Sequence, residues 1–136
     1  MKKTLNWIPF PFVTVAVFLM MLPSSAKATW TIDGGVRINS YHSYFDFIHI
    51  AYANWFLIIS AICAILGVFF ILYNAFNHKK GKPVLISVLI SVFSSAVSML
   101  FFNTVTTVSI IITLLLVISM GFHYLRFRTV IAQKEN

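Results

Sequence analysis

Three side chains near the end of a polar stretch have the types and spacing of a metal site. His42, Asp46 and His49 follow one another at i, i+4 and i+7, so a helix over these residues would bring two imidazoles and a carboxylate to one face. Zinc or iron accepts such a ligand set. A structural zinc site takes four ligands, however, and a solvated face on an interfacial helix is the commoner explanation of the pattern. We therefore expect no metal and no other cofactor.

The remaining reactive side chains do not indicate an enzyme. Cys63 is the only cysteine, which excludes an internal disulfide, and its apolar neighbours favour a protonated, unreactive thiol. His78 and His123 adjoin the basic ends of apolar segments, so we expect them at a membrane interface, too far from His49 to share a haem. The sequence has no glycine-rich phosphate loop and no paired carboxylates. We expect neither catalysis nor binding of nucleic acid, and no small-molecule substrate is indicated.

The composition identifies the environment in which the chain folds. Its 136 residues suit one domain, and 60% of them are hydrophobic while 10% are charged, against roughly 45–50% and 25% in a soluble domain. The mean hydropathy is +0.91. The net charge of +7 comes from basic residues at the ends of apolar segments. This distribution indicates a membrane protein and excludes a water-soluble globule.

The N-terminal segment has the parts of a secretory leader. Lys2 and Lys3 precede an apolar run over residues 12–22, which ends at Pro23, and small residues follow at Ala26 and Ala28. The run is about 11 residues long, whereas a spanning helix needs about 20. We predict a signal peptide over residues 1–28 with cleavage after Ala28. The alternative is an uncleaved signal anchor that begins near Trp7.

The polar stretch over residues 29–49 is expected to be a periplasmic, partly interfacial segment. Apolar residues alternate with polar ones on both sides of an Asp-Gly-Gly sequence at residues 33–35, which predicts a β-hairpin. The alternating residues are Trp30, Ile32, Val36 and Ile38. A helical spacing then predicts a lead-in helix at the headgroups, formed by Tyr41, Tyr44, Phe45 and Ile48.

The rest of the chain is long enough to cross a bilayer three times. Residues 50–76 form one apolar span, and residues 77–83 form a basic turn. Because residues 83–125 lack Lys, Arg, Asp and Glu and would make roughly 65 Å of helix, they must cross twice, as spans 84–102 and 105–125. We therefore expect an all-α membrane protein with three transmembrane helices after a signal peptide, or four if the leader is retained, and a short periplasmic segment that forms the hairpin.

The cations predict the orientation of these spans. Most of them fall on one side of the membrane, which the positive-inside rule makes cytoplasmic, together with the tail over residues 126–136. Cations at this surface attract anionic lipid headgroups by about 1 kcal/mol each. The headgroup contacts are expected from Lys79, Lys80, Lys82, Arg126 and Arg128. The chain is thus expected in a bacterial inner membrane as a multi-pass protein with a cytoplasmic C-terminus.

Small residues recur on one face of each predicted span, as in membrane helices that pack closely. Steps of four, three and four align the hydroxyls of Ser87, Ser91, Ser94 and Ser98. A sevenfold spacing aligns Ala53, Ser60, Gly67 and Asn74, with Ala64 beside them. The last span adds Thr106, Ser109 and Thr113. These faces indicate a packed bundle, and the alternative is that the serine face lines a wetted path or contacts further subunits.

The basic turn over residues 77–83 between two apolar helices, after a leader and a small outer segment, resembles the small inner-membrane and pilin-like subunits of bacterial type IV secretion and conjugation systems. The likeness covers residues 1–102, and the last span departs from the two-helix pilin pattern. It implies a non-catalytic subunit whose partners are the lipid bilayer, other membrane subunits or further copies of itself. The layout is also similar to pore-forming phage holins and to membrane immunity proteins against pore-forming bacteriocins, which are the alternatives.

Overall fold

The computed structural model describes residues 7–48, 54–77 and 82–132. Its elements follow in the order α1 (Pro9–Met20), β1 (Ala26–Thr31), β2 (Arg37–His42), α3 (Trp55–Asn77), α4 (Lys82–Phe101) and α5 (Thr107–Ala132). Three segments are long and apolar enough to cross a membrane, namely Trp55–Phe76, Lys82–Phe101 and Thr107–Leu125, and α1 is a shorter apolar helix. The prediction of three apolar helices of spanning length is confirmed for the part of the chain that the structure describes.

The turn between α4 and α5 lies where the polar patch predicted it, and its residues explain the break. Asn103 adopts a positive φ of 51°, a conformation that asparagine tolerates better than most residues. Thr106 then caps α5: its Oγ1 accepts the Ser109 N–H at 2.9 Å, and the Ser109 Oγ accepts the Thr106 N–H at 2.8 Å. The helix that follows continues to Ala132, so much of the expected tail after residue 125 is helical.

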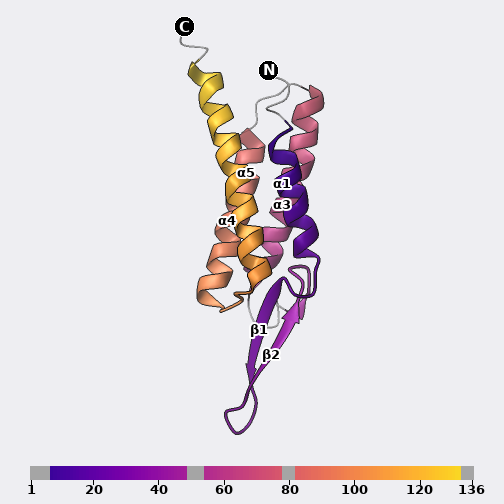
Figure 1. The fold of residues 1–136 in the computed structure, drawn as a ribbon, viewed down its shortest axis with the longest axis vertical. Coiled ribbons are helices and arrows are strands. Elements are labelled where there is room, and N and C mark those ends of the chain that lie inside the picture. The colour runs from indigo at the N-terminus through magenta and orange to yellow at the C-terminus, as the bar shows by residue number, and fades with distance from the viewer. Residues whose placement is uncertain (1–6, 49–53, 78–81, 133–136) are drawn as a thin grey trace.

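The four helices form an up-and-down bundle in which each neighbour is antiparallel (Figure 1). Helix α1 packs between α3 and α5, and α4 packs between the same two helices on the other side. Val13, Ala16 and Met20 of α1 are fully buried, and the ring of Phe12 stacks on Phe122 of α5 with centroids 5.9 Å apart. The leader segment therefore supplies one wall of the bundle.

Strands β1 and β2 form the predicted hairpin. They pair antiparallel from Ala26 opposite His42 to Thr31 opposite Arg37. The connecting turn contains Gly34 and Gly35 with φ angles of 99° and 79°, which only glycine adopts at low cost. The hairpin projects past the ends of the helices, at the end of the bundle where α1 finishes and α3 begins (Figure 1).

The lead-in helix predicted over residues 41–48 is wrong. Tyr41 and His42 end strand β2, and residues 43–47 form turns. One local and one long-range contact favour the turn over a helix: the Ser43 N–H donates to Asp46 Oδ2 at 3.1 Å, and the Tyr44 N–H donates to the Met20 carbonyl at 3.0 Å. As a result Tyr44 is fully buried in the bundle instead of lying among the headgroups.

Helix α3 lies close to two of its neighbours at Gly67. A Cβ atom built there would lie 3.2 Å from both Ser87 Oγ and Val88 Cγ2 of α4, and 3.7 Å from Val13 Cγ1 of α1. At Gly121 of α5, in contrast, a Cβ atom would meet nothing within 4 Å. The absence of a side chain at Gly67 therefore allows three helices to meet.

We predict that Gly67→Leu destabilises the bundle by about 1–3 kcal/mol, because the new side chain must push α4 and α1 away from α3. Gly121→Leu is the matched control and should leave stability within about 0.5 kcal/mol, since that position is open. Reversible unfolding in SDS and mild-detergent micelles measures both. Equal stabilities for the two variants would contradict the close contact at Gly67.

Candidate functional site

The α3–α4 interface is a row of hydroxyl contacts. Ser60 and Ser91 face each other, and each hydroxyl donates to the other residue's carbonyl, at 2.9 Å from Ser60 and 2.8 Å from Ser91. One step further along, Ser87 Oγ donates to the Cys63 carbonyl at 3.1 Å. Ser60 and Ser91 are fully buried and Ser87 is nearly so. These contacts join the backbones of the two helices directly, and they would be lost if the helices separated.

The row continues at the end of the bundle next to the hairpin. Asn54, just before α3, donates through Nδ2 to Ser98 Oγ at 2.9 Å, and Ser98 Oγ lies 2.9 Å from Thr104 Oγ1. All three residues are buried. The α4–α5 turn and the start of α3 are thus fastened to one serine of α4.

A second chain of hydroxyls runs from the connector into α5. The Tyr44 hydroxyl lies 3.1 Å from Ser95 Oγ, which lies 2.9 Å from Thr113 Oγ1, and Thr113 donates to the Ser109 carbonyl at 2.9 Å. Burial raises the pKa of Tyr44 to about 12, although the Ser95 hydrogen bond opposes part of the shift. The Tyr44 phenol is therefore neutral at physiological pH, and its O–H remains available for the hydrogen bond with Ser95.

The structure brings most of the predicted small-residue faces to the interior. All eight serines of α3, α4 and α5 are buried: Ser60, Ser87, Ser91, Ser94, Ser95, Ser98, Ser109 and Ser119. On α3 the buried set also includes Ala64, Gly67 and Asn74, whereas Ala53 lies outside the described residues.

Sequence reasoning missed Ser95, Asn54, Tyr44 and Thr104. Ser95 had a usable signal, because the steps from Ser91 to Ser95 and from Ser95 to Ser98 are four and three residues, which fit a helical face as well as the predicted series does. The other three lie in connections whose paths only the folded chain defines, and the helical spacing that includes Tyr44 predicts a lead-in helix instead of a contact with α4.

The base of the hairpin is tied to the bundle through the end of the leader. Ser25 Oγ donates to the Met20 carbonyl at 3.1 Å, and the Ser25 carbonyl accepts from Thr106 Oγ1 at 3.0 Å. The Lys27 N–H also points at the Thr104 carbonyl, at 3.4 Å. Both Ser25 and Ala26 are fully buried. The first residues of β1 are therefore held against the turn between α4 and α5.

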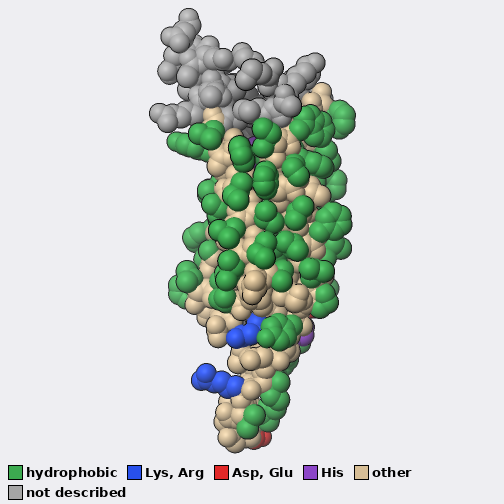
Figure 2. Space-filling view, in the orientation of Figure 1, with side chains coloured by type: hydrophobic (Ala, Val, Ile, Leu, Met, Phe, Trp, Pro, Cys, Tyr) green, Lys and Arg blue, Asp and Glu red, His purple; other side chains and the backbone are tan. Residues whose placement is uncertain are grey.

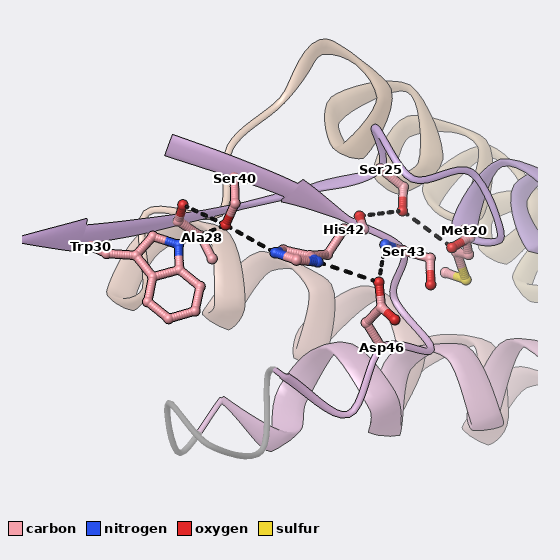
Figure 3. A network of polar contacts seen from close by, with 8 residues as sticks. All are labelled: Met20, Ser25, Ala28, Trp30, Ser40, His42, Ser43 and Asp46. Atoms are coloured by element: carbon pink, nitrogen blue, oxygen red, sulfur yellow. Dashed lines mark hydrogen bonds and ion pairs between the residues drawn. The ribbon is translucent and has the colours of Figure 1, made fainter. Parts of the chain in front are cut away.

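The candidate metal residues His42 and Asp46 do lie together, but a turn and not a helix brings them there. His42 Nδ1 is 3.4 Å from Asp46 Oδ2, and His42 Nε2 is 2.9 Å from Ser40 Oγ (Figure 3). The third candidate, His49, lies outside the described residues. Within 7–48, 54–77 and 82–132, no three metal-ligating side chains gather. Both ring nitrogens of His42 face protein atoms, so this imidazole bridges Ser40 and Asp46.

The contact order Ser40, His42, Asp46 is that of a serine nucleophile, its base and an orienting carboxylate. A hydrolase also needs N–H donors aimed at the developing oxyanion. The N–H directed at Ser40 is instead that of the Trp30 indole, 2.6 Å from the Ser40 hydroxyl oxygen itself (Figure 3). This series of contacts joins Trp30 of β1, Ser40 and His42 of β2, and Asp46 of the following turn, and it stabilises the base of the hairpin.

The expected headgroup cations are described in part. Lys82 is exposed at the start of α4, and Lys79 and Lys80 fall outside the described residues. Arg126 and Arg128 lie in the last turns of α5, whose backbone alone is described there. His123 is buried on a face of α5 that turns into the bundle, and its expected place near the membrane interface stays a prediction.

Neither a scan against protein-family models nor a search of characterised proteins or of solved structures finds a match to this chain. The function must therefore be argued from the surfaces that the structure presents. Two surfaces stand out: an apolar outer surface on the helices, and the projecting hairpin. The buried hydroxyls hold these two surfaces in place.

The Ser60–Ser91 pair should act as a unit. We predict that Ser60→Ala and Ser91→Ala each destabilise the bundle, with a coupling energy between them of about 0.6 kcal/mol, the average for hydrogen bonds between membrane helices. The control cycle pairs Ser60→Ala with Ser119→Ala, because the Ser119 hydroxyl has no partner among the described residues and should be additive. SDS-driven unfolding measures both cycles. Because the two carbonyls remain in the Ala variants, the coupling energy reports the contact between the two hydroxyls, which lie 3.1 Å apart. A coupling energy near zero for Ser60 with Ser91 would refute that contact, and unchanged stability of both single variants would refute the bonds to the carbonyls.

Proposed function

We propose that this protein is a non-catalytic structural subunit of a bacterial inner-membrane assembly. Its helices anchor it in the membrane, and its hairpin contacts another protein outside the cytoplasm. The observation that carries the proposal is the division of its surface. Beyond Lys82 and Thr107 at their starts, the exposed side chains of the spans are predominantly apolar, as lipid requires, whereas the hairpin extends a folded, partly apolar surface beyond them. A projecting element of this kind suits contact with another protein.

The proposed orientation places the hairpin on the periplasmic side of the membrane and both the N-terminus and the C-terminus on the cytoplasmic side. The start of α1, the start of α4 and the end of α5 lie at the same end of the bundle, opposite the hairpin (Figure 1). That end is adjacent in sequence to eight Lys or Arg residues, whereas Lys27 and Arg37 lie in the hairpin. The positive-inside rule then makes the hairpin periplasmic and the C-terminus cytoplasmic.

We further propose that the leader is retained. Cleavage after Ala28 would remove Val13, Ala16 and Met20 from the core and would break β1 in the middle of its pairing with β2. It would also remove Ser25, which binds the cap residue of α5. The support for retention is that the small-residue motif of the cleavage site is paired with β2 and that Ala26 is fully buried, so a peptidase would have to unpair the strand to reach its substrate.

The distribution of serines favours an anchoring role over a pore. A pore built from several copies needs a polar stripe on the outside of some helix, facing the lumen. In α3, α4 and α5 every serine is buried within the bundle, and the outward residues of α4 are apolar, such as Ile86, Leu89 and Phe93. Within residues 54–76 and 82–125, whose side chains the structure describes, the serines therefore form no outward polar stripe with which copies of this bundle could line a channel.

The orientation can be tested with reporters that are active only in the periplasm. A fusion after Phe47 should be active and a fusion after Lys80 should be silent, because the first site adjoins the hairpin and the second lies in the basic turn. The intact mass of the purified protein should include residues 1–28. The reverse reporter pattern would overturn the orientation. An intact mass that matches a chain beginning at Thr29 would overturn retention of the leader.

The assembly role predicts a specific combination of behaviours on expression. Native membranes should contain the protein in a complex much larger than its own 15.4 kDa, while growth and membrane potential stay unchanged. Loss of membrane potential would indicate a holin-like pore, and a free monomer that protects cells from a pore-forming bacteriocin would indicate an immunity protein. Blue-native electrophoresis, a potential-sensitive dye and bacteriocin challenge separate the three.

A further inference from the structure

The two faces of the hairpin differ in chemistry. Trp30 pairs with Ile38 across the strands, and Ile32 pairs with Val36 at the turn, where the Ile32 N–H donates to the Val36 carbonyl at 2.9 Å. Because side chains alternate along a strand, these four residues share one face. We call them the apolar face. Ile32, Val36 and Ile38 remain 50%, 61% and 46% exposed.

The opposite face of the hairpin is polar and basic. Its residues are Lys27, Thr29, Thr31, Arg37, Asn39 and Tyr41. Figure 2 shows the hydrophobic side chains along one side of the hairpin and the Lys and Arg side chains projecting from the other. Between Ala26 and His42 no Lys or Arg shares the apolar face. A two-stranded hairpin is marginal in water, so covering this face would stabilise it.

Lipid is not the occupant that the geometry favours. The hairpin continues along the long axis of the bundle (Figure 1), so its apolar face is carried away from the bilayer. To lie flat on the headgroups it would have to bend at its base, where Ser25, Lys27 and Tyr44 are hydrogen bonded to the helices and the α4–α5 turn. The face therefore suits a protein that reaches the same height above the membrane.

A second copy of this chain meets that condition. Two copies in one membrane share the same orientation and depth, so a twofold axis along the membrane normal brings their apolar faces together at matching height. Face-to-face packing leaves Lys27 and Arg37 of both copies on the outside, in water and far apart, so no like charges are buried. An acidic partner would instead be attracted to the basic face.

The size of the face decides how strong such a contact can be. Four side chains, three of them about half exposed, offer much less than the ~800 Å² per partner of a standard interface. The contact is therefore too small for two free hairpins in solution. Confinement in a membrane raises the effective concentration of the second copy and compensates for the small area.

We infer that the apolar face of the hairpin is a self-association surface, through which two copies pair outside the membrane. This inference rests on the proposed function in one respect, namely that the hairpin is the contact element of a membrane-anchored subunit. It adds the identity of the partner: a copy of the same chain, in the same membrane, related by a twofold axis.

Cysteine cross-linking tests the contact directly. In a Cys63→Ser background, Ile38→Cys should form a disulfide-linked dimer in native membranes about tenfold more than Asn39→Cys, since only facing Cβ atoms within bonding distance join. The two positions are neighbours and both are exposed, but they lie on opposite faces. Equal cross-linking, or none from Ile38→Cys, overturns the inference.

Charge substitution gives a second readout that does not depend on disulfide geometry. Val36→Glu with Ile38→Glu should abolish energy transfer between labelled copies in native-lipid nanodiscs, whereas Arg37→Glu should keep it. All three side chains are exposed, so the variants keep the buried contacts of the fold. Unchanged energy transfer in the double variant overturns the inference.

A photo-reactive residue at position 38 separates this inference from the proposed function. An adduct of twice the chain mass supports pairing of copies. An adduct of any other mass means that a different protein covers the apolar face, which overturns the self-association surface while the assembly role stands. Failure of the assembly role is seen elsewhere, in the periplasmic reporters and in the size of the native complex.

Discussion

A hydroxyl group inside a lipid layer finds no water to bond, so it is stabilised by a partner within the protein. Four serines of α3 and α4 find theirs in contacts between helices or with the neighbouring connections, whereas the Ser119 hydroxyl of α5 has no partner among the described residues. Ser60 and Ser91 exchange hydrogen bonds with each other's carbonyls, Ser87 bonds the Cys63 carbonyl, and Ser98 joins the start of α3 to the α4–α5 turn. Each contact needs the two helices at close distance, which the missing side chain of Gly67 permits. The antiparallel α3–α4 pair is the part of the structure on which the other elements are built.

The hairpin depends on this pair through a short series of contacts. Tyr44 bonds Ser95 of α4, and its backbone bonds the end of α1 at Met20. Ser25 joins the same end of α1 to Thr106, which also caps α5. The base of the hairpin is therefore attached to three helices at once. Its outer half has no such support, and there the exposed apolar residues gather.

The sequence predicted the helices well because their signals are compositional. A run of apolar residues without charge must span or be buried, and its length determines the number of crossings. The hairpin was also predictable, since Asp33 and the two glycines form a turn signal between alternating residues. The lead-in helix was wrong because Tyr44 fits a helical period equally well, and only the contacts with Met20 and Ser95 show that it turns into the bundle. Periodicity reports which residues could share a face, but it does not report whether a helix forms.

The sequence by itself determined that this chain has the composition of a membrane protein, that three of its helices are of spanning length and that hydroxyls line one side of α4. Those properties follow from composition and spacing, which the chain carries before it folds. Only the tertiary structure decided that α1 packs as a fourth helix, that Ser40, His42 and Asp46 form one chain of contacts and that the hairpin carries its apolar side chains away from the bundle. These outcomes depend on residues far apart in the sequence meeting in space, such as Ser25 with Thr106 and Tyr44 with Ser95. No local pattern encodes such a meeting, because the distance between the partners is set by the packing of all four helices.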